Sequence, residues 1–204
     1  MIMILCSGFC PALVAINYVN LSWQVSGNLQ KKVYFIMNWA QAIIASLKAQ
    51  AISMIAFVPD VSIDKVTRLM EKDSFFTVIA ATREEEAIGI ASGAYAVGRN
   101  AAVFMQSSGF GNSVNAIASL CMPCRIPIPM FINLRGQLGE FNIAQVAMGQ
   151  ATRPILDVLG LPHYILNASD DIEKVTIGAL QLCYGSRQPL AICLTPLLTG
   201  GKLV

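Results

Sequence analysis

The sequence predicts an α/β fold in which a single doubly wound parallel sheet carries helices on both faces. Short apolar runs without polar alternation recur along the chain, as expected for strands that are buried on both faces. Segments with helical periodicity separate these runs, and this alternation is typical of a parallel sheet. Hydrophobic residues make up 55% of the 204 residues and charged residues only 13%, so the chain can bury a large core.

Strands and helices are expected to alternate from residue 38 to residue 194. The expected strands are apolar runs, and they lie at 52–58, 75–80, 101–105, 128–132, 163–166 and 189–194. The expected helices lie at 38–50, 62–70, 112–120, 153–159 and 169–184, with one more that begins at Thr82. We expect a glycine-rich loop at 107–112 and the longest irregular stretch at 134–148. Long ordered loops are usually functional, which makes the second stretch a candidate site.

The first 36 residues differ from the rest of the chain. Residues 1–16 are apolar, but they are fewer than the roughly 20 residues that span a membrane, and no basic segment precedes them as in a secretory signal. Residues 1–36 show no clear period, which favours an upstream start codon over a structural extension. We therefore expect one domain over 37–204, preceded by an N-terminal extension whose place in the mature protein is open.

Charge and cysteine content exclude some classes of function. The net charge is +2 and the longest basic run is the pair Lys31 and Lys32, so nothing indicates a nucleic-acid partner. No stretch indicates a membrane partner either. Six cysteines without a signal peptide fit a reducing compartment, so the expected location is cytoplasmic.

Three consecutive acidic residues open the helix that begins at Thr82. Thr82 is a good N-cap, and Glu85 three residues later completes a capping box. Glu84 is different because, at helical spacing, it heads an apolar stripe that continues through Ile88. A carboxylate with apolar neighbours is disfavoured unless it has a partner, which makes it a candidate functional group. Glu86 heads a similar stripe, so periodicity alone does not choose between the two.

Two further patterns are weaker candidates. Cys121 and Cys124 form a Cys-x-x-Cys, which in a thiol-based redox protein stands at a helix start, whereas here it falls at an expected helix end. Buried cysteines more often act as small hydrophobic residues. His163, the single histidine, begins an expected strand far from the glycine-rich loop, so a structural role is favoured over acid–base catalysis.

Several motifs in order resemble a known family. Glu84 stands nine positions before Gly93 in an Ala-x-Gly-Ala-Tyr segment. Further motifs follow at 105–112, 126–127, 135–136 and 144–149. Together they resemble the pyrimidine-binding domain of thiamine-diphosphate-dependent 2-oxoacid decarboxylases, and most of all the sulfopyruvate and phosphonopyruvate decarboxylases. The resemblance covers residue 37 to the C-terminus.

The resemblance implies roles for particular residues. Glu84 would be the catalytic residue, hydrogen-bonded to N1′ of the aminopyrimidine. The residues implied to bind the cofactor are Glu84, Gln106, Ser108, Gly109, Gly111 and Asn112. Asp60 and Arg135 are the expected substrate-binding residues. Arg135 follows an apolar strand, at the edge where open α/β sheets bind ligands, and its guanidinium suits sulfonate or phosphonate oxygens. A surface arginine that closes a loop explains Arg135 equally well.

The resemblance also implies a partner. Enzymes of this family hold the diphosphate through Mg²⁺ on a second domain that carries a Gly-Asp-Gly, and this sequence contains no Gly-Asp-Gly. We therefore expect thiamine diphosphate and Mg²⁺ to be held mainly by a partner, a beta subunit, and no metal ligand on this chain. The chain would be the alpha subunit of a decarboxylase for sulfopyruvate or a 3-phosphono 2-oxoacid. The alternative is a non-catalytic binding or regulatory module of the same fold.

Overall fold

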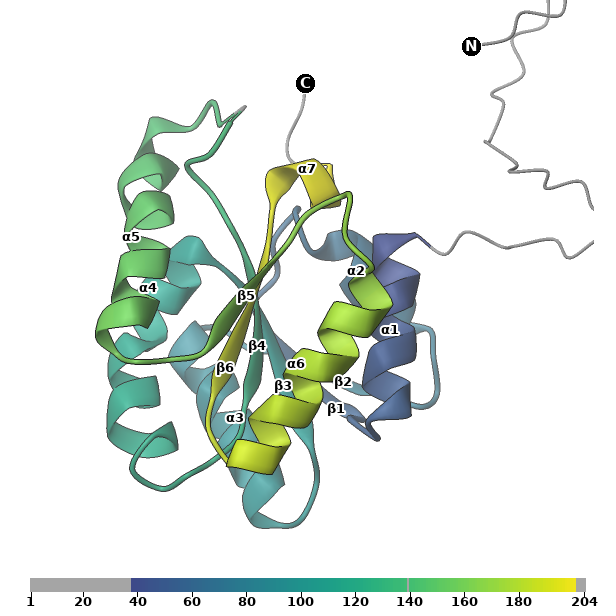
Figure 1. Ribbon diagram of the computed structural model, residues 1–204. Coiled ribbons are helices and arrows are strands. Elements are labelled where there is room, and N and C mark those ends of the chain that lie inside the picture. The colour runs from purple at the N-terminus through teal and green to yellow at the C-terminus, as the bar shows by residue number, and fades with distance from the viewer. Residues whose placement is uncertain (1–37, 139, 201–204) are drawn as a thin grey trace, which may run out of the picture. The chain divides into compact units, whose positions relative to one another are not determined.

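Six parallel strands form one sheet in the computed structural model, which describes residues 38–138 and 140–200. The strand order is β2-β1-β3-β4-β6-β5, and every neighbouring pair is parallel (Figure 1). The strands are β1 (Met54–Phe57), β2 (Thr77–Ala80), β3 (Ala101–Gln106), β4 (Pro129–Asn133), β5 (His163–Leu166) and β6 (Leu190–Leu194). The expected fold class is confirmed. Residues 1–36, the expected extension, lie outside the described residues.

Helices cover both faces of this sheet. The helices are α1 (Trp39–Ala49), α2 (Asp64–Glu71), α3 (Glu84–Ala96), α4 (Ser107–Ala116), α5 (Val146–Val158), α6 (Ile172–Ser186) and α7 (Pro196–Thr199), with a π-helical turn η1 (Ile117–Cys121) and a 3₁₀ turn η2 (Ile143–Gln145). Helices α1, α2 and α6 pack on one face, and α3, α4 and α5 pack on the other (Figure 1). None of the helices in the described ranges is long and apolar enough to cross a membrane.

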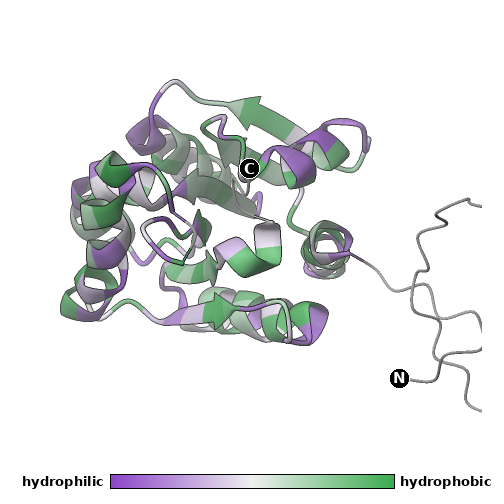
Figure 2. Ribbon diagram, turned by 90° about the horizontal axis from the view of Figure 1, so that it is seen from above, coloured by the Kyte–Doolittle hydropathy of each residue, from purple (hydrophilic) through white to green (hydrophobic). Residues whose placement is uncertain are grey.

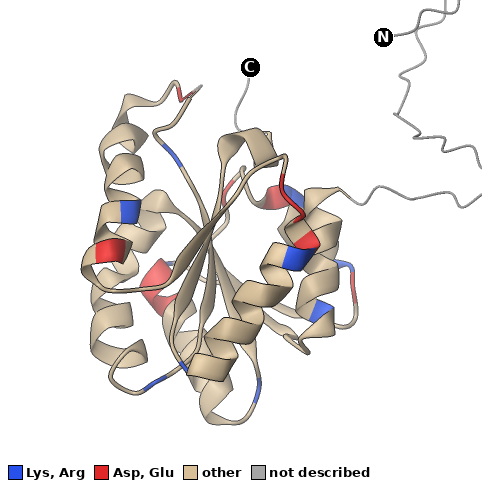
Figure 3. Ribbon diagram, in the orientation of Figure 1, with Lys and Arg blue, Asp and Glu red and all other residues tan. Residues whose placement is uncertain are grey.

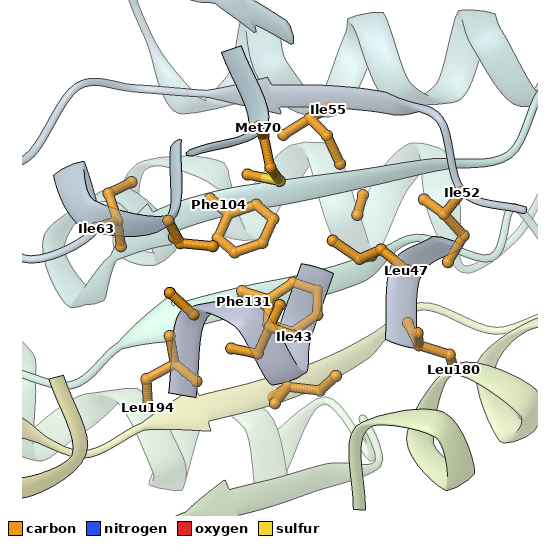
Figure 4. Close-up of a cluster of buried hydrophobic side chains, with 14 of the residues drawn as sticks. Ile43, Leu47, Ile52, Ile55, Ile63, Met70, Phe104, Phe131, Leu180 and Leu194 are labelled. Atoms are coloured by element: carbon orange, nitrogen blue, oxygen red, sulfur yellow. The ribbon is translucent and has the colours of Figure 1, made fainter. Parts of the chain in front are cut away.

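Alternating residues of β1, β3, β4, β5 and β6 enter two separate cores. Phe104 of β3 faces α1 and stacks on Phe131 of β4 at 4.4 Å between ring centroids, with the planes 5° apart (Figure 4). Its neighbours Val103 and Met105 enter the core on the other face, beneath α3 and α4. Because both faces are covered, the strand is apolar up to its last residue, Gln106, as the sequence predicts.

The described part of the chain begins with a capped helix. Asn38 Oδ1 accepts hydrogen bonds from the backbone N–H groups of Ala40 and Gln41 at 3.1 and 3.2 Å. Gln41 Oε1 in turn accepts from the N–H of Asn38 at 3.1 Å, which completes a capping box. The prediction that Asn38 caps this helix is confirmed.

The glycine-rich loop expected at 107–112 is wrong, because these residues form the first turns of α4. Helix α4 begins at Ser107, directly after the last residue of β3. Glycine in a helix costs about 1 kcal/mol relative to alanine, which is why Gly109 and Gly111 favour a loop when the sequence is considered alone. Close tertiary contacts at both glycines override this preference, as described below.

The long irregular stretch is shorter than expected. Helix α5 begins at Val146, seven residues before the expected start at 153. Gly149 and Pro154, two residues that disfavour a helix interior, both lie inside α5. Residues 134–138 and 140–142, the described part of the connection between β4 and η2, are called the β4 connection below.

The carboxyl ends of the strands define one edge of the sheet, onto which Figure 2 looks. Strand order reverses between β1 and β3, since β2 lies on one side of β1 while β3 and β4 lie on the other. In open α/β sheets ligands bind outside the carboxyl ends at such a reversal. Charged residues are sparse over the molecule (Figure 3), so those at this edge stand out.

Candidate active site

The carboxyl edge gathers the candidate residues that lie far apart in the sequence. Asp60 follows β1, Glu84 follows β2, Gln106 ends β3, and Arg135 follows β4. These strands are consecutive neighbours in the order β2-β1-β3-β4. The parallel topology therefore brings together every charged residue predicted for the site.

Glu84 is the buried member of its acidic cluster. It is the first residue of α3, and 8% of its surface is exposed. Asn112 Nδ2 of α4 donates to Glu84 Oε2 at 3.3 Å. The backbone of α4 also comes very close, because a Cβ added at Gly109 would lie 2.3 Å from Glu84 Oε1. A larger residue at 109 would force this carboxylate to move.

The other two glutamates serve the start of the helix. Arg83 is the N-cap residue of α3, and no side chain caps it. Glu86 Oε2 accepts from the N–H and Oγ1 of Thr82 at 2.8 and 2.6 Å, and Arg83 pairs with Glu85 at 2.8 Å. The capping box predicted between Thr82 and Glu85 is therefore wrong, because the N-cap residue is Arg83 and Thr82 donates to Glu86 instead.

Three other glycines of the motifs allow close approach around the same edge. A Cβ at Gly111 would lie 2.8 Å from Met148 Sδ, so α4 and α5 meet there. A Cβ at Gly136, which has φ +69°, would lie 2.7 Å from the carbonyl oxygen of Val146. At Gly149 it would lie 2.0 Å from the carbonyl oxygen of Arg135. The turn after β4 is thus clamped against the start of α5.

Arg135 is buried, with 6% of its surface exposed, so its interpretation as a surface arginine is wrong. Its Nε and Nη2 donate to the two carboxylate oxygens of Glu140 at 2.7 and 2.9 Å. Its Nη1 donates to Gln106 Oε1 at 3.2 Å, and its backbone N–H donates to Ser107 Oγ at 3.1 Å. The guanidinium fork predicted to bind a ligand is paired with a carboxylate of the chain itself.

Glu140 is a functional candidate that the sequence did not identify. The backbone N–H groups of Gly136 and Asn142 also donate to its carboxylate, at 3.2 and 3.0 Å. Hydrogen bonds from Arg135, supported by these N–H groups, lower the pKa of the Glu140 carboxyl to about 2 against the effect of burial. The available signal was an acidic residue five positions after Arg135 in the longest irregular stretch.

Asp60 and Ser108 are less constrained. Asp60 Oδ1 accepts from the N–H of Ser62 at 2.9 Å and from the Ser62 hydroxyl. The hydrogen bond to Glu140 is the main cause that raises the pKa of Arg135, and the charge of Asp60 contributes in the same direction, so Asp60 lies near that guanidinium. Ser108 is half-buried at the start of α4.

The remaining candidates lie outside this edge. Cys121 ends η1, as expected for a helix end, and its Sγ lies 3.8 Å from Ser92 Oγ in the core. Burial raises the pKa of the Cys121 thiol, which is opposite to the shift of a reactive thiolate. His163 begins β5, where Nδ1 lies 3.2 Å from the carbonyl oxygen of Leu161. Within residues 38–138 and 140–200, no cluster of three or more His, Cys, Asp or Glu could hold a metal ion.

The arrangement matches a known class of domain. A family model described as "Thiamine pyrophosphate enzyme, N-terminal TPP binding domain" matches residues 37–132. The fold is similar to the 2-oxoglutarate:ferredoxin oxidoreductase from Magnetococcus marinus, with a TM-score of 0.62 and 12% identity. It is also similar to an enzyme from Mycobacterium smegmatis described as thiamin diphosphate-dependent, with a TM-score of 0.61 and 15% identity. Each match covers 80% of this chain but only 29% and 31% of the solved chain.

Curated relatives are more similar in sequence. The sulfopyruvate decarboxylase subunit alpha of Methanococcus maripaludis is 36% identical over 161 residues, which are 79% of this chain and 96% of the relative. The same subunit of Methanocaldococcus jannaschii is 39% identical over 156 residues, 76% of this chain and 92% of the relative. A phosphonopyruvate decarboxylase of Streptomyces viridochromogenes is 29% identical over 150 residues, 73% of this chain and 38% of the relative. This chain belongs to the thiamine pyrophosphate enzymes and, among them, to the family of sulfopyruvate decarboxylase alpha subunits.

Proposed function

We propose that this chain is the alpha subunit of a thiamine-diphosphate-dependent decarboxylase that converts sulfopyruvate into sulfoacetaldehyde and carbon dioxide. Relatives named as sulfopyruvate decarboxylase alpha subunits support the proposal, since they are 36% and 39% identical over more than nine tenths of their own length. A 3-phosphono 2-oxoacid is the second candidate substrate, because a phosphonopyruvate decarboxylase is 29% identical. The higher identity favours sulfopyruvate.

The observation that carries the proposal is the buried carboxylate of Glu84. Within the described residues, a single long hydrogen bond from Asn112 reaches it, and that bond engages Oε2. Oε1 lies beside the backbone of Gly109 and accepts no hydrogen bond from the described residues, so a ligand can supply its donor. A buried carboxylate with so little support is disfavoured until a donor joins it. The protonated N1′ of an aminopyrimidine is such a donor, so these residues fit the cofactor.

Each residue of this site has a proposed task. Glu84 holds a proton at N1′ of the aminopyrimidine, and Asn112 keeps its carboxylate oriented. The residues proposed to line the cofactor site are Glu84, Gln106, Ser108, Gly109, Gly111 and Asn112. When bound, thiamine diphosphate accepts the electron pair left by carbon dioxide. The apolar core beneath α3 and α4 keeps water away from the buried side of Glu84.

Arg135 is proposed to bind the sulfonate of the substrate. Its guanidinium has paired donors in a planar fork, which match two oxygens of a sulfonate or phosphonate. It lies at the carboxyl edge next to Gln106, one of the residues proposed for the cofactor site. Asp60 is proposed to line the same part of the site, on the loop after β1.

A beta subunit is proposed to hold the diphosphate and Mg²⁺. Support comes from large apolar side chains that are exposed on the β4 connection and the neighbouring turns of the carboxyl edge. Leu138, Phe141, Ile143 and Leu197 are 83%, 63%, 88% and 66% exposed. Exposed apolar residues that gather in this way often mark an interface. A cytoplasmic location belongs to the same proposal, and the free thiols of Cys121, Cys124, Cys183 and Cys193 fit it.

The proposal is tested by reconstitution. The purified chain, mixed with thiamine diphosphate, Mg²⁺ and a panel of 2-oxoacids, should release no carbon dioxide. Addition of a partner of similar length that carries a Gly-Asp-Gly should produce carbon dioxide from sulfopyruvate. Turnover by the single chain would contradict the need for a partner. A reconstituted complex that decarboxylates only 2-oxoacids without an acidic tail would contradict the proposed substrate.

Residues 37–204 are proposed to be the working domain, and residues 1–36 to be dispensable. The family model begins at residue 37, which fits this division. A chain that starts at Met37 should fold and keep the melting temperature of the whole chain. A melting temperature several degrees lower, measured by circular dichroism, would show that the first 36 residues contribute to the stability of the domain.

A further inference from the structure

The carboxylate of Glu140 occupies a site with the composition of an oxyanion site. Four N–H groups donate to it, two from the Arg135 fork and one each from the backbones of Gly136 and Asn142. Of the ion pairs in the described ranges, this is the one in which both side chains are almost fully buried, 7% and 8% exposed. Charge-assisted donors grouped in this way suit any compact oxyanion, whether carboxylate, sulfonate or phosphonate.

Arg135 is held in place independently of Glu140. Its Nη1 is bonded to Gln106 Oε1, and its backbone N–H is bonded to Ser107 Oγ. Its carbonyl oxygen lies so close to Gly149 that a Cβ there would overlap it. These contacts join Arg135 to β3, α4 and α5, so the fork keeps its position if the carboxylate leaves.

Glu140 is held by its carboxylate and by one backbone hydrogen bond, which its N–H donates to the carbonyl oxygen of Gln137 at 2.9 Å. Its described neighbours Leu138, Phe141 and Asn142 are exposed, and Phe141 and Leu138 contribute nothing to either core. A segment with so few buried contacts opens at low free energy. The pair is therefore asymmetric, with a fixed guanidinium and an exchangeable carboxylate.

We propose that Glu140 occupies the binding site for the acidic tail of the substrate, and that the tail displaces it when substrate binds. This inference rests on the proposed role of Arg135 in sulfonate binding. Arg135 is buried, and a buried cation without a partner is strongly disfavoured. One anion, either the Glu140 carboxylate or the tail, is consequently always present on the fork.

The exchange makes Glu140 a specificity-determining residue. As an anion tethered to the same chain, Glu140 competes at a high effective concentration with any free anion. Inorganic sulfate or phosphate, which binds through a single group, is excluded by this competition. A 2-oxoacid with an acidic tail is also bound through its other end, so it can displace Glu140. Pyruvate has no tail and leaves the pair intact.

The full-length chain carrying Glu140→Gln tests this inference without any turnover. The amide keeps the shape of the side chain but removes the competing charge. Inorganic sulfate should bind this variant at least tenfold more tightly than it binds the wild-type chain, measured by isothermal titration calorimetry. The double variant Glu140→Gln with Arg135→Met should lose this increase in sulfate affinity. Glu71→Gln, which changes an exposed glutamate on α2, should bind sulfate as weakly as the wild type.

Equal sulfate affinity of the Glu140→Gln variant and the wild type would overturn the inference and leave Glu140 as a permanent support of the β4 connection. Sulfate binding needs no decarboxylation, so a wrong proposed substrate would show in the turnover assay and not in this one.

A second measurement uses wild-type protein in case the variant does not fold. Carbodiimide labelling of carboxyl groups, located by mass spectrometry, should find Glu140 protected in the reconstituted complex. Addition of sulfopyruvate should increase labelling of Glu140 several-fold and leave that of Glu71 unchanged. Addition of pyruvate should change neither. Protection of Glu140 that persists at every concentration of sulfopyruvate would contradict displacement.

Discussion

The two edges of the sheet use glycine and the left-handed backbone for different purposes. At the amino edge, the connections that lead from helices into strands contain residues with positive φ, namely Ala51, Gly98, Arg125, Gly160 and Arg187. Gly98 and Gly160 have open space where a Cβ would stand, so they serve backbone conformation alone. At the carboxyl edge, Gly109 and Gly149 instead make room for Glu84 and the Arg135 carbonyl. The amino edge supports stability, and the carboxyl edge arranges chemical groups.

The largest effect is expected from Glu84→Gln at the carboxyl edge. The amide keeps the shape but cannot hold the proton at N1′, so the activity of the reconstituted enzyme should fall by about 10² or more. Glu85→Gln and Glu86→Gln are matched controls, because within the described residues their side chains form hydrogen bonds with Thr82 and Arg83 at the start of α3. Steady-state rates of carbon dioxide release separate the three variants. A greater loss in Glu86→Gln than in Glu84→Gln would show that the wrong glutamate was chosen.

Arg135→Lys should affect substrates with an acidic tail more than substrates without one. Lysine keeps the charge but loses the fork, so KM should rise far more for sulfopyruvate than for pyruvate. Removal of the side chain should cost about 1.5–3 kcal/mol of sulfopyruvate binding, the range for a hydrogen bond to a charged group. Arg153→Lys, on the exposed side of α5, is the matched control. An equal rise of KM for both substrates would mean that Arg135 does not contact the tail.

Gly109→Ala and Gly98→Ala sharpen the comparison of the two edges. The first places a methyl group against Glu84 and should cost about 1–3 kcal/mol through overpacking. The second forces alanine into a left-handed conformation and should cost about 1–2 kcal/mol. Both should lower the melting temperature, but only Gly109→Ala should lower activity at temperatures where both variants are folded. Loss of activity in Gly98→Ala would contradict the division between the edges.

The last expected effect is a change of stability with pH. The folded-state pKa of Glu140 is about 2, below its usual value of 4.5, so the ionised carboxylate stabilises the fold above pH 4.5. That stabilisation is lost as the pH falls from 4.5 toward 2. Without added sulfate, wild type should therefore exceed Glu140→Gln in stability at neutral pH, and the difference should shrink across this window. A difference that stays constant from pH 6 to pH 2.5 in urea titrations would contradict the assigned pKa.

Much of the fold could be predicted because its strands are apolar on both faces. The apolar run at 163–166 predicted the bounds of β5 correctly. Asn38, as the expected N-cap, predicted the start of α1 correctly. The stripe that Glu84 shares with Ile88 made it a candidate for burial, but the same argument applied to Glu86, which is exposed. These features depend on residues close in the sequence, where side-chain periodicity and capping chemistry act.

The errors arose where distant segments decide local structure. The glycine at 109 marks a close contact with Glu84, 25 positions earlier, and does not mark a loop. The pairing of Arg135 with Glu140 was missed because no periodicity links residues in an irregular connection. Burial of Arg135 likewise depends on β3 and α5, which reach it only through the tertiary fold. Contacts of this kind override local propensity and leave no local pattern.

The direct passage from β3 into α4 has a consequence for how this chain can change. Gln106 ends the strand and Ser107 begins the helix, with no residue between them. One residue inserted here would advance the strand by about 3.3 Å or rotate the helix, and either change would move Gly109 out of alignment with Glu84. The β4 connection has no such constraint at its exposed residues. Length variation among relatives should therefore concentrate after β4, while the junction of β3 and α4 should tolerate neither insertion nor deletion.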